Sequence, residues 1–263
     1  MEDQRKKVVE EVEDHKFKSI RKDKNKMELI NKKDNQIVFK AEIDETVANS
    51  IRRYLDEISV LAINEVEIFK NDSPLYDETI AHRMGLVPLK MEKTSGEASL
   101  KLVSKKEGIV YSGEIQGAIK PAHDKIPITS LNKGQELEIV ANVNFGKGKE
   151  HSKFSPGLMF YRNILEIKMD KNFYDKVKMA CPNSEIKEKG DKLVIVDDKQ
   201  KEICDVCEGI CEKVGKKAEV EIKDGLIITL ESFGQLEVED IFKKAIDELE
   251  KDLSEISKKI EKN

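Results

Sequence analysis

The chain has 263 residues, of which 38% are charged, and its formal net charge is only −5, so both signs of charge are interspersed. This composition provides no overall basic field to hold nucleic acid, and an aromatic content of 5%, without any Trp, leaves few platforms for stacking bases. No apolar run is long enough to span a bilayer and no signal-peptide core is present, so we expect a cytoplasmic protein that contacts no membrane.

The chain begins with a charged segment and then becomes regular. Lys and Glu dominate residues 1–26, which we expect to form a mobile extension. Ordered structure is expected from near Met27. Apolar and polar residues alternate between Ile37 and Ile43, a pattern that predicts a half-buried strand.

A capped helix is expected over residues 46–58. Asp44 is a good N-cap residue, and the apolar side chains that follow recur every three or four positions, as on one face of a helix. These side chains are Val47, Ile51, Leu55 and Ile58. Arg52 and Arg53 are directed away from the centre of this face, so we expect them at the surface.

A strand is expected next, over residues 60–69, followed by a second helix that begins at Asp77. Ile80 and Met84 lie one turn apart in that helix, and Gly85 is typical of a helix end.

Two segments of these helices carry a family resemblance. N-S-I-R-R at residues 49–53 and A-H-R-M-G-L-V-P-L at residues 81–89 resemble segments of the D subunit of archaeal RNA polymerase, a relative of the bacterial alpha subunit and the eukaryotic third-largest subunit. In that family the first helix faces the large catalytic subunits. The resemblance therefore implies a large-subunit docking surface that includes Asn49, Arg52, Arg53 and Arg83.

The middle of the chain reads as a mainly β region. Short apolar segments at residues 98–103, 110–115 and 137–144 are separated by clusters of Gly, Pro, Ser and Lys, and no long amphipathic helix interrupts them.

A Gly-x-Gly motif follows at Gly146–Gly148. It lacks the Gly-Lys-Ser/Thr ending of a phosphate-binding loop, so we expect a turn that leaves a strand. The next residues resemble a pattern of the archaeal D subunits, in which His-x-Lys is followed by an aromatic residue and Ser-Pro; they are His151, Lys153, Phe154, Ser155 and Pro156.

Four cysteines carry the strongest chemical signal in the chain. Cys204, Cys207 and Cys211 lie within eight residues of one another, and Cys181 lies before Pro182. Nothing indicates an oxidising compartment, so disulfides are not expected. Three closely spaced thiolates and a remote Cys-Pro suit one 4Fe–4S cluster, and tetrahedral zinc is the competitor.

The surroundings of the cysteines favour iron over zinc. Expected elements are a strand at 165–169, a helix at 172–179 and a strand at 193–196, and apolar residues interleaved with the thiols would shield a cluster from water. The region resembles the ferredoxin-like domain of many archaeal D subunits. The spacing between Cys207 and Cys211 is one residue longer than in ferredoxins and only one ligand set exists, so a 3Fe–4S cluster or zinc remains an alternative.

The C-terminal region is expected to form a hairpin over residues 220–230, with a Lys-Asp-Gly turn, and then a long helix. The helix has an apolar stripe at near-heptad spacing: Val238, Phe242, Ala245, Leu249, Leu253, Ile256 and Ile260. Such a stripe needs a facing helix or sheet, and its end beyond Leu249 is difficult to cover within the chain. Residues 234–249 resemble the dimerisation helix of the archaeal D subunits. The resemblance implies pairing with the small subunit L through Phe242, Ala245, Leu249, Leu253 and Ile256.

These patterns predict an α+β fold. By resemblance, residues 27–58 and 218–263 form a discontinuous, alpha-subunit-like dimerisation domain. A mainly β domain at residues 59–164 and a ferredoxin-like metal-binding domain at residues 165–217 are inserted between its halves.

The resemblance implies a non-catalytic scaffold in DNA-directed RNA polymerase, a nucleotidyltransferase complex. It would pair with subunit L, recruit the small subunits N and P, dock the large B subunit, and meet DNA only through the polymerase. The chain has four His and no nucleophile–base pair at a recognisable spacing, so no catalytic site is expected. The alternatives are an iron–sulfur electron-transfer protein and a self-dimerising structural protein stapled by zinc. Co-purification with polymerase subunits would distinguish the polymerase scaffold from both of these alternatives.

Overall fold

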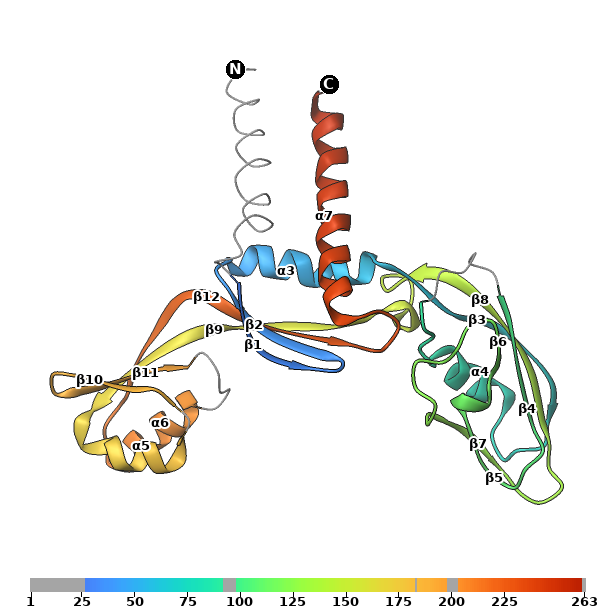
Figure 1. The fold of residues 1–263 in the computed structure, drawn as a ribbon, viewed down its shortest axis with the longest axis horizontal. Coiled ribbons are helices and arrows are strands. Elements are labelled where there is room, and N and C mark those ends of the chain that lie inside the picture. Colours follow the sequence, from blue (N-terminus) through green and yellow to red (C-terminus); the bar gives the residue numbers. More distant parts are fainter. Residues whose placement is uncertain (1–26, 92–97, 183, 198–202, 262–263) are drawn as a thin grey trace. The chain divides into compact units, whose positions relative to one another are not determined.

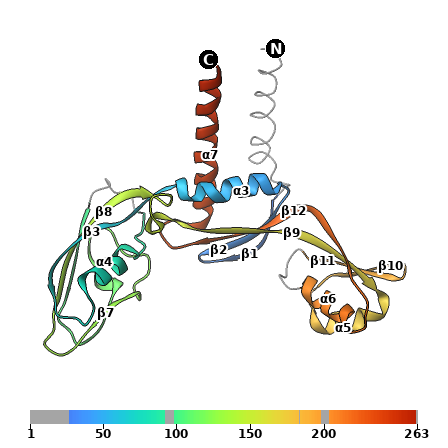
Figure 2. The same ribbon diagram turned by 180° about the vertical axis from the view of Figure 1, so that it is seen from behind.

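The computed structural model describes residues 27–91, 98–182, 184–197 and 203–261 (Figures 1 and 2). The expected mobile extension at residues 1–26 lies outside the described residues. The chain divides into two compact units. The first takes its described residues from 27–32, 37–48 and 160–229, and the second from 33–36, 49–159 and 230–261.

A six-stranded sheet forms most of the first unit, in the order β1-β2-β12-β9-β11-β10. Its strands are β1 (Met27–Lys33), β2 (Gln36–Ala41), β9 (Gly157–Asp170), β10 (Ile186–Lys189), β11 (Lys192–Asp197) and β12 (Glu219–Ser232). Ile37, Phe39 and Ala41 are buried, which confirms the predicted alternation in β2. The pattern ends before Ile43, which lies beyond the strand.

The hairpin predicted at residues 220–230 is wrong. β12 runs through the Lys-Asp-Gly segment without turning, because it is paired with β2 on one side and β9 on the other. Gly225 has φ +92°, and a Cβ there would lie 3.0 Å from the carbonyl oxygen of Ala41. The glycine therefore allows close approach to the neighbouring strand, a known function of glycine within strands.

Two helices cover the β9–β11–β10 end of this sheet. They are α5 (Tyr174–Ala180), preceded by a 3₁₀ turn at Lys171–Phe173, and α6 (Ile203–Glu212). α5 and the strand β11 match the sequence prediction, whereas α6 was not predicted. The apolar side chains of these helices and strands form one core, which includes Ile167, Val177, Leu193 and Ile203.

The helix predicted at residues 46–58 starts as expected and ends earlier. The N–H of Val47 donates to Asp44 Oδ1 at 2.9 Å, which confirms the N-cap. α3 (Glu45–Tyr54) then tightens into a 3₁₀ turn, η2 (Leu55–Glu57). Ile51 and Leu55 are buried as predicted, while Val47 is only half-buried.

The second unit contains a separate β region (Figure 1). Its four-stranded sheet has the order β3-β8-β4-β6, formed by β3 (Ser59–Asn71), β8 (Leu137–Lys147), β4 (Ala98–Ser104) and β6 (Gln116–Gly117). A second sheet pairs β5 (Gly108–Tyr111) with β7 (Pro127–Leu131). The strand predicted at residues 110–115 is wrong beyond Tyr111, where the chain enters the 3₁₀ turn η3 (Ser112–Glu114).

One helix, α4 (Asp77–Gly85), packs into this β region with the predicted boundaries. Its buried side chains, Ile80 and Met84, join a core built from both sheets. After β8 the chain forms the 3₁₀ turn η4 (Ser152–Phe154), and the last helix is α7 (Val238–Glu261), the long helix predicted from the apolar stripe. No helix in the described ranges is both long enough and apolar enough to cross a membrane.

Candidate functional site

The outward side of α3 carries three of the four residues predicted to dock a large subunit. Asn49, Arg52 and Arg53 are spaced three and four positions apart and so share one side of the helix. Both arginines are exposed. Nε and Nη2 of Arg52 donate to Asn49 Oδ1 at 3.2 and 2.8 Å, which holds this guanidinium along the helix surface.

Arg83, the fourth predicted docking residue, lies on α4. Its Nη1 donates to the carbonyl oxygen of Ile128 in β7 at 2.9 Å. This bond ties the smaller β-sheet to α4, so the structure gives Arg83 a function in holding the β region together. Its docking role stays a prediction.

A polar junction joins the end of α3 to the loop after β8. Nζ of Lys147 and of Lys149 approach Glu57 Oε2 at 3.1 and 2.8 Å, and Ser155 Oγ donates to Asp56 Oδ1 at 2.9 Å. The hydrogen bond from Lys149, reinforced by Lys147, lowers the pKa of Glu57 below its ordinary value, although burial opposes this shift. The carboxylate therefore stays ionised and fastens the loop.

The Gly-x-Gly motif is explained by this junction. A Cβ on residue 146 would lie 2.6 Å from the ring of Phe154, and a Cβ on residue 148 would lie 2.3 Å from Asp56 Oδ1. Both glycines therefore let neighbouring side chains approach the backbone. β8 ends at Lys147 and a turn follows, as the sequence predicts for this segment.

The predicted dimerisation residues of α7 fall into two groups. Ala245 and Leu249 are buried within the chain, and Phe242 and Leu253 are half-buried. Ile256 is 53% exposed, and Ile260, on the same predicted stripe, is 59% exposed.

α7 is fastened to the end of α3 and to the turn that follows it. α7 packs against η2, and Tyr54 Oη donates to Asp252 Oδ2 at 2.9 Å. Burial and the neighbouring Asp252 carboxylate raise the pKa of Tyr54, so the phenol keeps its proton for this bond.

The four cysteines gather in the core beneath α5 and α6. Cys204, Cys207 and Cys211 lie on one face of α6, and Cys181 follows the end of α5. All are free thiols, buried except for the half-buried Cys204. This arrangement brings together the residues that the sequence predicts as ligands.

The charge environment and the geometry of these thiols bear on whether they fit a metal. Burial raises the pKa of Cys207 to about 12, and the three other cysteines contribute to the rise, so each acts on this sulfur. In the part of the chain that the structure describes, no group of three or more His, Cys, Asp or Glu side chains is arranged to hold a metal ion. As placed, the thiols do not form a ligand set, and the iron–sulfur cluster and its zinc alternative stay predictions.

Comparison with known proteins identifies the family. The family model described as RNA polymerase Rpb3/RpoA insert domain matches residues 66–167, which cover most of the β region of the second unit. DNA-directed RNA polymerase subunit Rpo3 of Thermococcus kodakarensis is 33% identical over 78% of this chain and 85% of its own length. The chain belongs to the Rpo3 family. Rpo3 of Pyrococcus horikoshii is 32% identical over 84% of this chain and 92% of its own, and Rpo3 of Methanosphaera stadtmanae is 33% identical over 84% and 93%.

Family membership confirms the resemblance to the archaeal D subunits and to the alpha subunit. As an Rpo3 protein, the chain is a polymerase subunit and works with other polymerase subunits in transcription. The match also shows an alpha-subunit-like insert domain at residues 66–167, in a mixed α/β structure made mainly of strands. The predicted dimerisation domain at residues 27–58 and 218–263 lies outside this match and stays a prediction. The ferredoxin-like description of the cysteine region finds no support in these comparisons.

Sequence reasoning missed the two acidic residues that organise the junction. Asp56 and Glu57 lie between Leu55 and Ile58, the last two residues of the apolar stripe, and they bind a loop more than 90 residues further along the chain. The lysines at 147 and 149, on either side of Gly148, were the available signal, because paired cations in a glycine turn favour an acidic partner.

Proposed function

We propose that this Rpo3 chain is a non-catalytic scaffold that pairs with the small subunit L through α7. The observation that supports this most directly is the exposure of the distal apolar residues of the helix, Ile256 at 53% and Ile260 at 59%. Full burial of such a side chain contributes about 1.5–3 kcal/mol. Covering the exposed half of each would therefore contribute about 1 kcal/mol per residue, and a facing helix is the natural cover.

The packing of α7 supports a rigid attachment for such a partner. Val238, Ile241 and Ala245 are buried within the chain, and Tyr54 holds Asp252 one turn before the exposed end. A partner that binds the distal end would therefore be held in a fixed orientation relative to η2, against which α7 packs.

The outward side of α3 is proposed to dock the large B subunit. Arg52 and Arg53 place two guanidinium groups on one exposed side of the helix, and guanidinium forks suit carboxylates on a partner surface. Recruitment of the small subunits N and P is proposed on the family resemblance alone.

The hydrogen bonds of two histidines support the non-catalytic part of the proposal. His123 Nε2 lies 3.1 Å from the carbonyl oxygen of Phe233, and His151 Nδ1 accepts from the N–H of Lys153. These contacts support structural functions for both imidazoles.

Co-expression with subunit L, followed by size-exclusion chromatography, tests the pairing. The wild-type chain is expected to elute as a one-to-one heterodimer. Ile256→Asn should weaken it, whereas Lys258→Asn, which introduces the same side chain on the opposite side of the same turn, should not. A chain that elutes alone, or as a homodimer indifferent to subunit L, would refute the pairing.

We also propose that Cys181, Cys204, Cys207 and Cys211 hold one iron–sulfur cluster, with zinc as the alternative. The donor set supports this, since all four cysteines belong to or pack against one core cluster and thiolates are the ligands of both groups. Binding would require each thiol to lose its proton and the side chains to rearrange. Iron, sulfide and zinc analysis of anaerobically purified protein tests it. A metal-free, folded protein would refute both versions.

A further inference from the structure

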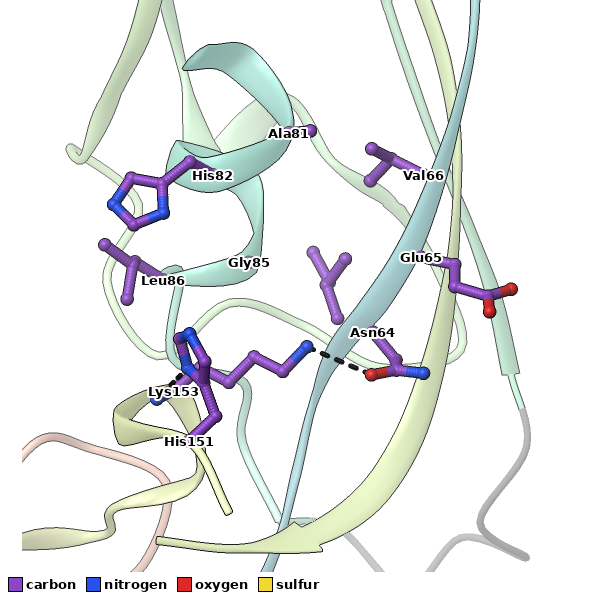
Figure 3. A pocket seen from close by; sticks show the side chains of 10 residues that line it. Asn64, Glu65, Val66, Ala81, His82, Gly85, Leu86, His151 and Lys153 are labelled. Atoms are coloured by element: carbon purple, nitrogen blue, oxygen red, sulfur yellow. Dashed lines mark hydrogen bonds between the residues drawn. The ribbon is translucent and has the colours of Figure 1, made fainter. Parts of the chain in front are cut away.

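A pocket in the β region of the second unit has no assigned function. It has a volume of about 390 Å³ and opens between β3, the end of α4 and the turn η4 (Figure 3). Its lining includes Asn64, Val66, His82, Leu86, His151 and Lys153, and we call it the Lys153 pocket. It therefore combines one ammonium and two imidazoles with an apolar edge, and the carboxylate of Glu65 also belongs to its lining.

Lys153 has an environment that is unusual for a charged side chain. It is half-buried, its Nζ donates to Asn64 Oδ1 at 3.0 Å, and it lies 5.0 Å from the centroid of the Phe154 ring. Neither neighbour carries a negative charge. Among the described residues Lys153 makes no ion pair within 4.0 Å.

The one nearby carboxylate does not meet this cation. Glu65 also lines the pocket, but Figure 3 shows its carboxylate directed away from Lys153, while the amide of Asn64 faces Lys153. Burial lowers the pKa of Lys153, and the Glu65 charge only partly opposes the shift. An ammonium held partly out of water, with an uncharged acceptor, is stabilised when an anion reaches it.

The chain builds this environment with specific local features. The ladder between β3 and β8 is interrupted between Ile63 and Glu65, so Asn64 is the extra residue of a β-bulge and is aimed at Lys153. The N–H of Lys153 donates to His151 Nδ1 at 3.1 Å, which fixes this ring beside the pocket with its other nitrogen free to donate. The close approach of Phe154 to Gly146 positions the same turn.

We infer that the Lys153 pocket docks an acidic side chain, Asp or Glu, from another polypeptide of the polymerase. The inference rests on the proposed scaffold function. Lys153 and the Nε2–H of His151 would donate to the carboxylate oxygens, and Leu86, which is 47% exposed at the rim, would pack against the apolar stem of the same residue or its neighbour.

The chemistry favours a carboxylate over a phosphate. A phosphate with two charges requires several permanent cations or a row of N–H donors, and a nucleic-acid backbone requires a line of cations. Lys153 is the single Lys or Arg side chain among the residues that line this pocket. Glu65 also lines the pocket but does not pair with this ammonium within 4.0 Å, so the single ammonium matches one carboxylate of an Asp or Glu.

Zero-length cross-linking of the assembled polymerase tests the contact. A carbodiimide activates a carboxylate, a lysine amine within contact distance displaces the urea, and an amide forms with net loss of one water. Lys153 is expected to be joined to an Asp or Glu of another subunit, identified by mass spectrometry. The internal pair Lys101–Glu138, 2.7 Å apart, is the positive control. If Lys101 is joined to Glu138 and Lys153 is joined to no other subunit, or only to its own Glu65, the proposal is wrong. A phosphate occupant would give the same negative result.

A variant measures the contribution of the contact. Lys153→Met keeps most of the aliphatic stem and removes the charge, and Lys106→Met makes the same charge change at an exposed position of the same β region. In competition for assembly against the wild-type chain, Lys153→Met is expected to be at least about tenfold weaker, as for loss of a charged hydrogen bond, and Lys106→Met less than about twofold weaker. If both isolated variants have the melting temperature of the wild-type chain, misfolding is excluded as the cause of weaker assembly.

Two kinds of failure can be told apart. If the wild-type chain joins no polymerase subunit, the proposed scaffold function fails. If it assembles, but Lys153→Met competes as well as Lys106→Met, only the docking of an acidic side chain at this pocket is overturned.

Discussion

The junction between the end of α3 and the loop after β8 predicts a large effect from one methyl group. In Gly148→Ala, the added Cβ would lie 2.3 Å from Asp56 Oδ1 and 2.9 Å from Asp56 Cβ and Cγ. The obstacle is a short side chain close to its own backbone, so it cannot swing away as a long flexible side chain would. Residue 148 has no positive φ, so the expected cost comes from crowding and not from backbone strain.

The cost has two parts. Overpacking of this kind costs about 1–3 kcal/mol. Displacing the carboxylate also breaks the 2.9 Å hydrogen bond from Ser155 Oγ, and a hydrogen bond to a charged group contributes about 1.5–3 kcal/mol. The surrounding side chains can relax in part, which reduces both the overpacking cost and the loss from the hydrogen bond. We therefore expect Gly148→Ala to lower the free energy of unfolding by about 2–4 kcal/mol.

Urea unfolding followed by circular dichroism measures this loss. Gly209→Ala is the control, and it should have the opposite effect. A Cβ there meets nothing within 4 Å, and replacing Gly by Ala within a helix should raise the free energy of unfolding by about 0.5–1 kcal/mol. The decisive comparison is Gly148→Ala in an Asp56→Gly background, where Cβ, Cγ and Oδ1 of residue 56 are all removed and the substitution should become nearly neutral. An equal loss in both backgrounds would show that the crowding argument is wrong.

Three further predictions concern other contacts. Arg162→Met should cost about 2–3 kcal/mol in urea unfolding, because it removes the 3.1 Å ion pair of the buried Asp197. Glu57→Gln should destabilise the chain at pH 7 and much less at pH 3: its pKa is lowered in the folded state, so its contribution is present above its ordinary value of 4.5 and lost as pH falls through the folded value. In metal-free protein, iodoacetamide with mass spectrometry should label half-buried Cys204 first and buried Cys207 last, and preferential labelling of Cys207 would contradict the packing.

The helices were predictable where several local signals agreed. Asp77 and Gly85 bound α4 because an acidic first turn and a glycine end act on the helix itself. The long helix α7 was predicted from the spacing of its apolar residues alone. The end of α3 was misplaced by one turn, because the same apolar stripe continues through a 3₁₀ turn whose carboxylates are bound by distant lysines.

The β region and the cysteines show where local signals fail. Lys-Asp-Gly is a strong turn signal, yet β12 continues through it because pairing with two neighbouring strands outweighs the local preference. The cysteine spacing was interpreted through ferredoxin loops, which do not require a helix. In the structure the same residues form α6, since positions 204, 207 and 211 also match one helical face.

The candidate site was predictable only in its separate parts. Arg52 and Arg53 were expected at the surface and lie there. The contacts of Asp56 with Ser155, and of Asn64 with Lys153, each join residues about 90 or more positions apart. No periodicity or spacing reports such a pair, because it depends on which strands meet and on a bulge in one of them.

The packing of α7 also affects how much free energy is spent on ordering this helix when a partner binds it. Starting an isolated helix is unfavourable, because several residues must be ordered for the first hydrogen bond, whereas extending an existing helix adds one bond for each residue ordered. The buried first half of α7 supplies this start from within the chain. A partner would therefore meet a template that is already wound, and little of its binding free energy would be spent on ordering this side of the interface.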